Sequence, residues 1–191
     1  EIRLLKQFCK SARVYGAESY IKGLSGYVCE ILTVYYGSFL RVIRNAVKWK
    51  DKVVIDVEGY YNGKNVIKEL SFSKTYSPLI VIDPVQKERN ASASISKEKF
   101  ILFRSKCKEF LKKPDLSFFS EKEITINDIK KIAGRRKFII LSVLPLKGKD
   151  DIIGCKLLRV FEYINKSLLR NDFEMVESNW YWNRENAIYY F

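Results

Sequence analysis

Apolar residues recur every three or four positions over most of the chain, which places them on one face of an α-helix. The helices predicted from this spacing cover residues 1–15, 26–36, 39–49, 97–111, 126–133 and 150–169. Three of them follow a serine that can accept a backbone N–H as an N-cap, namely Ser25, Ser38 and Ser96. Thr125 and Asp128 resemble a capping box. Gly16 and Gly37 are expected to end the first two helices in the left-handed conformation.

Other, shorter stretches either alternate apolar with polar residues or are continuously apolar, as is typical of β-strands. The strands predicted from them cover residues 53–57, 66–72, 79–82, 138–144, 173–182 and 187–191. Asn62-Gly63 is a strong signal for a β-hairpin joining the first two strands. Asp83-Pro84 is expected to stop the third strand, because proline has no N–H for a sheet ladder.

These elements predict an α+β protein with two domains. Lys113-Pro114-Asp115 has the composition of a boundary, so residues 1–112 would form a helical domain with a small β-hairpin and strand element. Residues 113–191 then follow the order strand, helix, strand, strand, the first part of a ferredoxin-like sandwich. That is also the fold of RNA-recognition domains. The sequence has no RNP1 pattern, however, so it does not imply that bases stack on the sheet.

Charge points to a polyanionic partner. The 191 residues include 35 Lys and Arg against 22 Asp and Glu, a net charge of +13, which favours nucleic acid. Histidine is absent, which removes the commonest general base and metal ligand. No apolar run approaches the roughly 20 residues of a membrane helix, and no signal peptide opens the chain.

The four cysteines are far apart and form no C-x-x-C pair, so a zinc site is not expected. Each lies among apolar residues, which indicates reduced thiols in an intracellular, cytoplasmic protein. The chain opens on Glu1 and stops at Phe191 inside an apolar run. We therefore expect a fragment of a longer protein, with its second domain incomplete at the C-terminus.

Two stretches carry candidate binding residues. Arg3, Lys6, Lys10 and Arg13 recur on one face of the first predicted helix as a basic stripe. A triphosphate would relieve their mutual repulsion, although an ordinary solvated face is the alternative. The polar loop 83–95 carries Arg89, whose planar fork suits a phosphate or a base edge, and Asn90, which donates and accepts. A solvated connection between strand and helix is the alternative there.

Catalytic patterns are missing. The sequence contains no phosphate-binding loop and no nucleophile elbow. Asp56 and Glu58 alternate on a predicted strand and could share one face, a weak signal for Mg²⁺. The chain is therefore expected to be a binding part rather than a complete catalyst.

Three groups of short sequence motifs resemble one protein family. Leu-Leu-Lys-Gln-Phe at 4–8 is followed by Val-Tyr-Gly-Ala-Glu at 14–18, then by Gly-Leu-Ser-Gly-Tyr at 23–27 and Glu-Ile-Leu at 30–32. Asp-Pro-Val at 83–85 and Arg-Asn-Ala at 89–91 complete the set. In this order they closely resemble the central domain of archaeal-type (class I) CCA-adding tRNA nucleotidyltransferases. Residues 112–191 resemble that family's body domain by element order alone.

The resemblance implies an enzyme that adds C, C and A to the tRNA 3′ end from CTP and ATP. It places Mg²⁺ on aspartates of a head domain that would precede Glu1, so this fragment alone should lack catalytic residues and metal ligands. Lys6 and Tyr15 resemble triphosphate ligands, and Arg89 resembles the residue that reads the base with help from the RNA. Lys10, Asp83 and Asn90 are supporting candidates.

The sequence departs from the family pattern at a few places. Arg-Asn-Ala replaces Arg-Asn-Val, Gly-Leu-Ser-Gly replaces Gly-Phe-Ser-Gly, and the segment from Asp51 to Pro78 is long. Phosphate contacts to tRNA are expected from Arg135, Arg136, Lys147 and Lys149. A stand-alone RNA-binding module and a part of a poly(A) polymerase-like enzyme are the alternatives, and a homodimer is left open.

Overall fold

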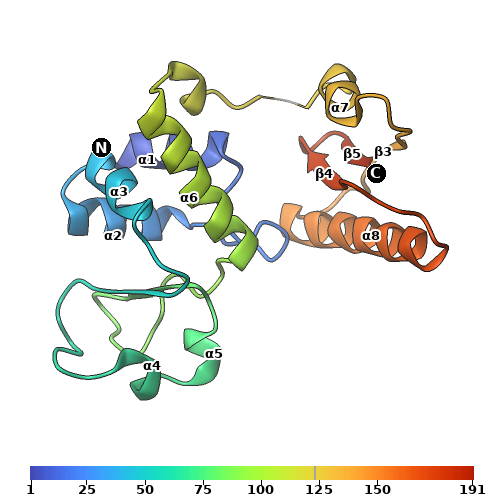
Figure 1. Cartoon of the computed structure of the whole chain (residues 1–191). Coiled ribbons are helices and arrows are strands. Elements are labelled where there is room, and N and C mark those ends of the chain that lie inside the picture. Colours follow the sequence, from blue (N-terminus) through green and yellow to red (C-terminus); the bar gives the residue numbers. More distant parts are fainter. Residues whose placement is uncertain (123) are drawn as a thin grey trace. The chain divides into compact units, whose positions relative to one another are not determined.

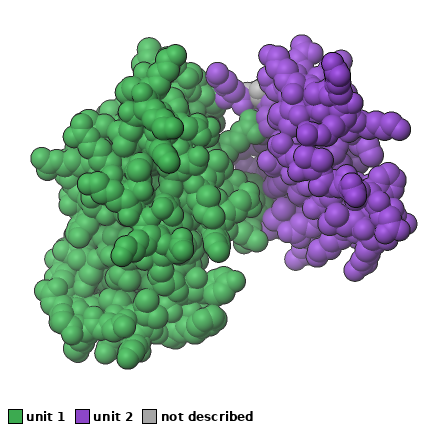
Figure 2. Space-filling view, in the orientation of Figure 1, with its two compact units in different colours: residues 1–121 green, residues 122–191 purple. Residues whose placement is uncertain are grey.

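The computed structural model describes residues 1–122 and 124–191, which form two compact units, Glu1–Glu121 and Lys122–Phe191 (Figure 2). The mixture of helices and small sheets confirms the predicted α+β class. Among the described residues, no helix has both the length and the apolar composition needed to span a bilayer.

Four helices build the core of the first unit: α1 (Ile2–Ser11), α2 (Gly26–Tyr36), α3 (Phe39–Ala46) and α6 (Lys97–Lys112) (Figure 1). Their buried faces meet in a cluster of aromatic rings centred on Phe8. The ring centroids of Phe39 and Phe110 each lie 5.7 Å from that of Phe8, in edge-to-face geometry. Such contacts add to the stabilisation from burial alone.

Serine caps position three of these helices as predicted. Ser25 accepts the N–H of Val28, and Ser38 and Ser96 cap α3 and α6 in the same way. Gly37 ends α2 with φ 85°, a conformation that glycine adopts without steric cost.

The first helix is shorter than predicted, so Tyr15 does not lie on it. Arg13 occupies the left-handed region with φ 57°, and the N–H of Val14 donates to the carbonyl of Cys9. This is a Schellman ending, with Arg13 in the place expected of Gly16. After this ending, the N–H of Leu24 donates to the carbonyl of Val14, and the carbonyl of Leu24 accepts the N–H of Gly16. This pairing with the segment around Leu24 overrides the local helical pattern.

The predicted hairpin around Asn62-Gly63 is wrong. Strands β1 (Val53–Asp56) and β2 (Leu79–Ile82) pair in parallel, with Val53 opposite Leu79. Parallel strands need a crossover, and this one contains the short helices α4 (Val66–Glu69) and α5 (Phe72–Thr75). The predicted strand 66–72 is therefore wrong: residues 66–69 form α4 and Phe72 begins α5, and Asn65 caps α4 by accepting the N–H of Ile67.

The first unit extends past the predicted domain boundary. The 3₁₀ helix η1 (Leu116–Phe119) follows α6 and packs on α1. The side-chain amide of Gln7 donates to the carbonyl of Phe119 at 2.8 Å, and the hydroxyl of Ser11 donates to the carbonyl of Ser120 at 2.9 Å. Residues 113–121 thus pack within the first unit.

The second unit contains α7 (Ile126–Ala133), β3 (Ile140–Val143), α8 (Asp150–Arg170), β4 (Asn179–Trp182) and β5 (Ala187–Tyr190). The capping box of Thr125 and Asp128 is present. β5 lies between β3 and β4 and is antiparallel to both. This order matches the first three strands of a ferredoxin-like sheet.

The core of the second unit is small and centres on Tyr189. Its hydroxyl donates to the carbonyl of Leu157 on α8 at 3.0 Å, which ties the helix to the sheet. Burial raises the pKa of Tyr189 to about 12, because ionisation would leave a charge without solvent.

Candidate functional site

The first turn of α2 is where three elements bring polar groups together. A Cβ atom placed on Gly26 would lie 2.9 Å from the Tyr15 hydroxyl and 3.5 Å from Lys6 Nζ. The side chains of Lys6 and Tyr15 therefore end beside the first residue of α2. A helix N-terminus also carries unpaired N–H groups and a partial positive charge. The arrangement suits an anion, and a side chain at position 26 would crowd the Tyr15 hydroxyl.

Lys6 is held at this position by Glu30, one turn further along α2. Their charged atoms lie 2.6 Å apart. The hydrogen bond to Glu30 raises the pKa of Lys6 above its ordinary value, against a smaller desolvation effect. Glu30 was not predicted as a site residue, although its spacing of four from Gly26 places it on the same helix face.

Lys10 contributes through Tyr15. Its Nζ lies 5.5 Å from the centroid of the Tyr15 ring, a cation–π distance. Tyr15 also forms a β-bridge with Leu24, which fixes the backbone that carries the ring. Arg13 follows the end of α1, so only part of the predicted basic stripe is helical.

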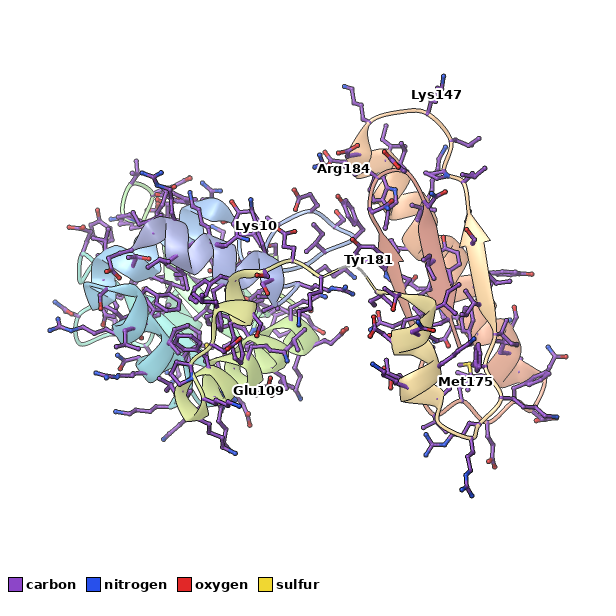
Figure 3. The ribbon with its side chains drawn as sticks, turned by 90° about the horizontal axis from the view of Figure 1, so that it is seen from above. Lys10, Glu109, Lys147, Met175, Tyr181 and Arg184 are labelled. Carbon is purple, nitrogen blue, oxygen red and sulfur yellow. The ribbon has the colours of Figure 1, made fainter. Side chains whose placement is uncertain are left out.

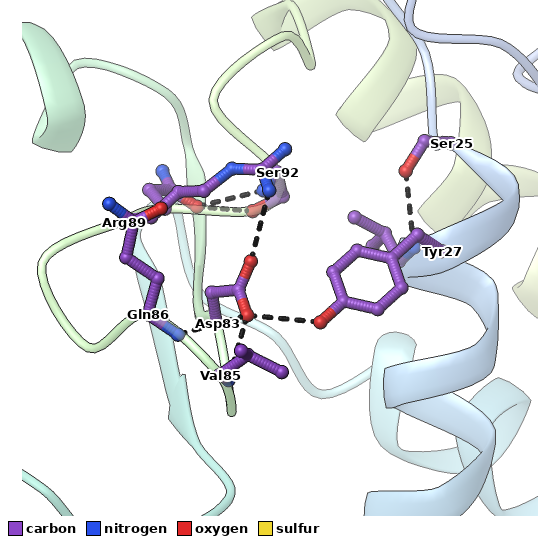
Figure 4. A network of polar contacts seen from close by, with 9 residues as sticks. Ser25, Tyr27, Asp83, Val85, Gln86, Arg89 and Ser92 are labelled. Carbon is purple, nitrogen blue, oxygen red and sulfur yellow. Dashed lines mark hydrogen bonds and ion pairs between the residues drawn. The ribbon is translucent and has the colours of Figure 1, made fainter.

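Asp83 is the centre of a second group, shown in Figure 4. Its side chain is buried at the end of β2, where Oδ1 accepts the Tyr27 hydroxyl at 3.0 Å. The same oxygen accepts the backbone N–H groups of Val85 at 2.9 Å and Gln86 at 3.3 Å. Oδ2 accepts from Arg89 Nη1 at 3.2 Å. One carboxylate thus joins the loop after β2 to α2.

These contacts keep Asp83 ionised. Burial by itself would raise the pKa of the carboxyl, but donors outweigh it and lower the pKa below the ordinary value. The donors, in order of effect, are Val85, Tyr27 and Gln86, followed by the charge of Arg89. The pKa of Tyr27 is raised, first by desolvation and then by its bond to Asp83.

Arg89 presents its remaining surface to solvent. One guanidinium nitrogen is bound by Asp83, yet 58% of the side chain is exposed. A fork anchored on one side can offer its other donors to a ligand in a defined direction.

Asn90 faces the protein interior instead. Its Oδ1 accepts the N–H groups of Val81 at 3.0 Å and Ser92 at 2.9 Å. Its Nδ2 donates to the Lys74 carbonyl at 2.8 Å and the Ser77 hydroxyl at 3.0 Å. With these groups engaged, Asn90 contributes to the site by positioning the backbone next to Arg89.

Two tyrosines from the crossover hold the same loop. The Tyr60 hydroxyl donates to the carbonyl of Pro84 at 2.7 Å, and the Tyr61 hydroxyl donates to that of Lys87 at 2.9 Å. Tyr61 is itself fixed, because its N–H donates to Asp56 at 2.8 Å. The loop from Asp83 to Arg89 is thus bound by partners from α2 and from the crossover.

The two groups are anchored on consecutive residues of α2, Gly26 and Tyr27. Lys6 and Tyr15 reach Gly26, while Tyr27 reaches Asp83 and through it Arg89. That Lys6, Tyr15 and Arg89 share one cleft stays a prediction. Tyr27 was not predicted as a site residue, although it ends the Gly-Leu-Ser-Gly-Tyr motif at 23–27 that contributes to the family resemblance.

The four predicted phosphate contacts of the second unit do not form one patch. Arg135 and Arg136 precede β3, whereas Lys147 and Lys149 follow it. Arg136 lines a hollow of about 760 Å³ together with Met175. Figure 3 shows Lys147 and Met175 at opposite ends of this unit. The two pairs are therefore separated by the length of the strand.

A family model described as "tRNA nucleotidyltransferase, second domain" matches residues 1–120. This range covers nearly all of the first unit, including Lys6, Tyr15 and Arg89.

Curated relatives cover both units. A CCA-adding enzyme of Archaeoglobus fulgidus is 36% identical over 183 residues, 93% of this chain and 39% of the relative. One of Thermococcus kodakarensis is 36% identical over 187 residues, 94% of this chain and 40% of the relative. One of Nanoarchaeum equitans is 52% identical over 103 residues, 53% of this chain and 26% of the relative. The chain thus spans two fifths or less of the length of these three relatives.

Proposed function

We propose, since this chain belongs to the tRNA nucleotidyltransferase family, that it is the nucleotide-selecting and tRNA-docking part of a CCA-adding enzyme. The whole protein would add C, C and A to the tRNA 3′ end from CTP and ATP. The observation that carries the proposal is that Lys6 and Tyr15 lie beside Gly26, while the next residue, Tyr27, is hydrogen-bonded to the Asp83 that holds Arg89.

Lys6, Tyr15 and the N-terminus of α2 would hold the triphosphate. Lys6 supplies a compact charge on a flexible stem, and Tyr15 supplies a hydroxyl donor. An arriving phosphate would compete with Glu30 for Lys6, and after transfer Glu30 could take Lys6 back from pyrophosphate. This gives binding strong enough to hold the nucleotide and reversible enough to release the product.

Arg89 would select the base. Its free donors can meet two acceptors on one base edge, in the manner of bidentate arginine contacts. Asp83 keeps the guanidinium in one orientation, while Tyr27, Tyr60 and Tyr61 fix the loop. Selection requires such a fixed donor, because a freely rotating arginine would adapt to any base.

The chemical step is assigned to the longer protein. Phosphoryl transfer to a tRNA hydroxyl uses Mg²⁺ to stabilise charge on the reacting oxygens. In this proposal, aspartates of a separate head domain hold the ion. A cytoplasmic location would accompany these substrates and fits four cysteines that are all free thiols.

Phosphates of tRNA would be bound by Arg135 and Arg136 at one end of β3 and by Lys147 and Lys149 at the other. The separation of the two pairs suits an extended polyanion better than a small one. Replacing all four by glutamine should weaken tRNA binding and flatten its dependence on salt. Replacing either pair should give about half of that change in slope.

Nucleotide binding by the 191-residue chain tests the proposal. CTP, ATP, UTP and inorganic triphosphate are titrated while the amide signals of residues 6, 15, 26 and 89 are followed by NMR. Lys6→Ala should weaken all four ligands alike. Arg89→Ala should leave inorganic triphosphate unchanged and alter the ratio of CTP to UTP binding. Lys108→Ala and Arg41→Ala, exposed on α6 and α3, serve as matched controls.

The outcomes separate the alternatives. Equal losses for every nucleotide in Arg89→Ala would remove base selection from Arg89. Binding of tRNA without any nucleotide response at these residues would favour a stand-alone RNA-binding module. The contacts at Gly26 and Tyr27 would then be an ordinary packing feature.

A further inference from the structure

The crossover between β1 and β2 forms a lobe with an unassigned hollow. We call residues 60–76 the crossover lobe. Figure 1 shows its helices α4 and α5 grouped at one end of the first unit, apart from α1, α2, α3 and α6. A hollow of about 330 Å³ lies between this lobe and the loop after β2, and Lys64, Lys74 and Lys87 line it with Tyr60, Tyr61 and Ser71.

The three lysines are available to a ligand. Glu69 and Glu88 also line the hollow. Within the described part of the chain, however, neither approaches any of these amino groups to ion-pair distance. Three unpaired ammonium groups around one hollow repel each other, and an anion placed between them relieves that repulsion.

An exposed aromatic pair lies on the same lobe as the hollow. Phe72 and Tyr76 on and next to α5 are 77% and 75% exposed. Their ring centroids are 5.7 Å apart with an interplanar angle of 65°. Ser71, which lines the hollow, directly precedes Phe72, so the hollow and the aromatic pair belong to the same short segment of the lobe. Exposed rings and unpaired lysines on one lobe are the combination that binds single-stranded nucleic acid, through base stacking and phosphate contacts.

We propose that the crossover lobe is a binding site for single-stranded RNA. The lysines of the hollow would contact backbone phosphates, and Phe72 and Tyr76 would stack with unpaired bases. A protein partner fits less well, because lysine is depleted from protein interfaces and three buried ammonium groups would need new partners. The inference rests on the proposed function, whose substrate has a single-stranded 3′ end, and it adds a specific surface for that strand.

The site adjoins the loop that positions Arg89. Lys87 lines the hollow and accepts the Tyr61 hydroxyl at its carbonyl, and Tyr60 binds the carbonyl of Pro84. RNA that occupies the lobe therefore contacts the same residues that fix the loop. Bound RNA should consequently slow hydrogen exchange of the amides in 83–90 as well as those in 60–76.

Anisotropy with a fluorescein-labelled RNA of about eight nucleotides tests the stacking contact. Phe72→Ala combined with Tyr76→Ala should weaken binding roughly 5- to 100-fold without changing the salt slope. Phe72→Trp with Tyr76→Trp should retain binding, whereas Phe72→Leu with Tyr76→Leu should not. Leu116→Ala, at a position 84% exposed on η1, is the control for loss of an exposed apolar side chain.

The phosphate contacts are tested by salt dependence. Replacing Lys64, Lys74 and Lys87 by glutamine should lower the slope of log K against log salt by roughly 0.7 for each RNA phosphate that no longer meets a lysine. The matched control replaces Lys97, Lys108 and Lys112, three exposed lysines of α6, by glutamine. Equal slopes for the two triple variants would mean that the lobe contributes only general charge, and would overturn the proposal.

Other results would also decide against it. RNA affinity unchanged in the aromatic alanine variant would exclude stacking, while CTP titrations of Lys6→Ala and Arg89→Ala would still test the proposed function separately. Sedimentation that shows an oligomer dissociating in the aromatic variant, with RNA binding intact, would identify a protein interface instead.

Discussion

Lys6 and Arg89 are each paired with one carboxylate, but in opposite surroundings. Lys6 and Glu30 lie 2.6 Å apart with side chains 27% and 46% exposed. Arg89 is 3.2 Å from Asp83, whose side chain is only 3% exposed. Solvent screens the first pair and makes its partner replaceable. The second pair depends on the buried Asp83 carboxylate, which also accepts bonds from other donors. The Lys6–Glu30 pair is therefore the shorter of the two but constrains its basic side chain less.

The difference matches two tasks. A group that holds and releases a triphosphate benefits from an exchangeable partner, whereas a group that discriminates between bases benefits from a fixed one. Four substitutions test this contrast, beginning with the one expected to have the largest effect.

Asp83→Ala should destabilise the first unit by about 3–5 kcal/mol, because Tyr27, Val85 and Arg89 would lose a buried ionised acceptor. Urea unfolding, followed by NMR signals of the first unit, measures the loss. Glu30→Ala is the matched control and should cost no more than about 1 kcal/mol. Equal costs for the two variants would abolish the distinction between the pairs.

Asn90→Ala should cost about 2–3 kcal/mol, since the buried N–H of Val81 and the Ser77 hydroxyl lose a partner. Ser92 provides a second acceptor to Val81, which limits the loss. The half-buried Asn45, whose side-chain amide donates to the Arg41 carbonyl of its own helix, is the control. A loss no greater than that of Asn45→Ala would show that the Asn90 amide is dispensable for anchoring the loop.

Tyr27→Phe should cost about 1 kcal/mol by removing one donor to Asp83. It should also raise the pKa of Asp83 toward its ordinary value of 3.8. The lowered pKa means that this carboxylate stabilises the fold above pH 3.8 and that the stabilisation is lost as pH falls toward the folded-state pKa. NMR titration and unfolding at several acidic pH values should therefore show a smaller loss in Tyr27→Phe than in the wild type.

Glu30→Gln should have the smallest effect on stability, within about 0.5 kcal/mol, because the pair with Lys6 is solvent-accessible. The pKa of Lys6 should fall toward its ordinary value. If phosphate competes with Glu30, inorganic triphosphate should bind more tightly to this variant. Weaker binding would indicate that Glu30 positions Lys6 and does not compete with the ligand.

Local rules account for much of the fold. Serine caps at Ser25, Ser38 and Ser96 and the capping box at Thr125 were predictable, because each bond joins residues within one turn. The buried run Leu79–Ile82 and the stop at Asp83-Pro84 were likewise readable from the chain. The assignment of Lys6, Tyr15 and Arg89 to one nucleotide site came from the family resemblance and stays a proposal, which the contacts at Gly26 and Tyr27 support.

The sequence by itself determined where the serine-capped helices α2, α3 and α6 begin, which residue types could meet an anion, and which family the chain resembles. These depend on neighbouring residues or on the order of short motifs. Only the tertiary structure decided that α1 ends at Ser11, because pairing of Val14 with Leu24 outweighs the local pattern. It also decided that residues 66–69 form the helix α4 instead of part of a strand, because β1 and β2 pair in parallel. The Tyr27 hydroxyl donates a hydrogen bond to Asp83, 56 residues away in the sequence, and no local periodicity predicts such a contact.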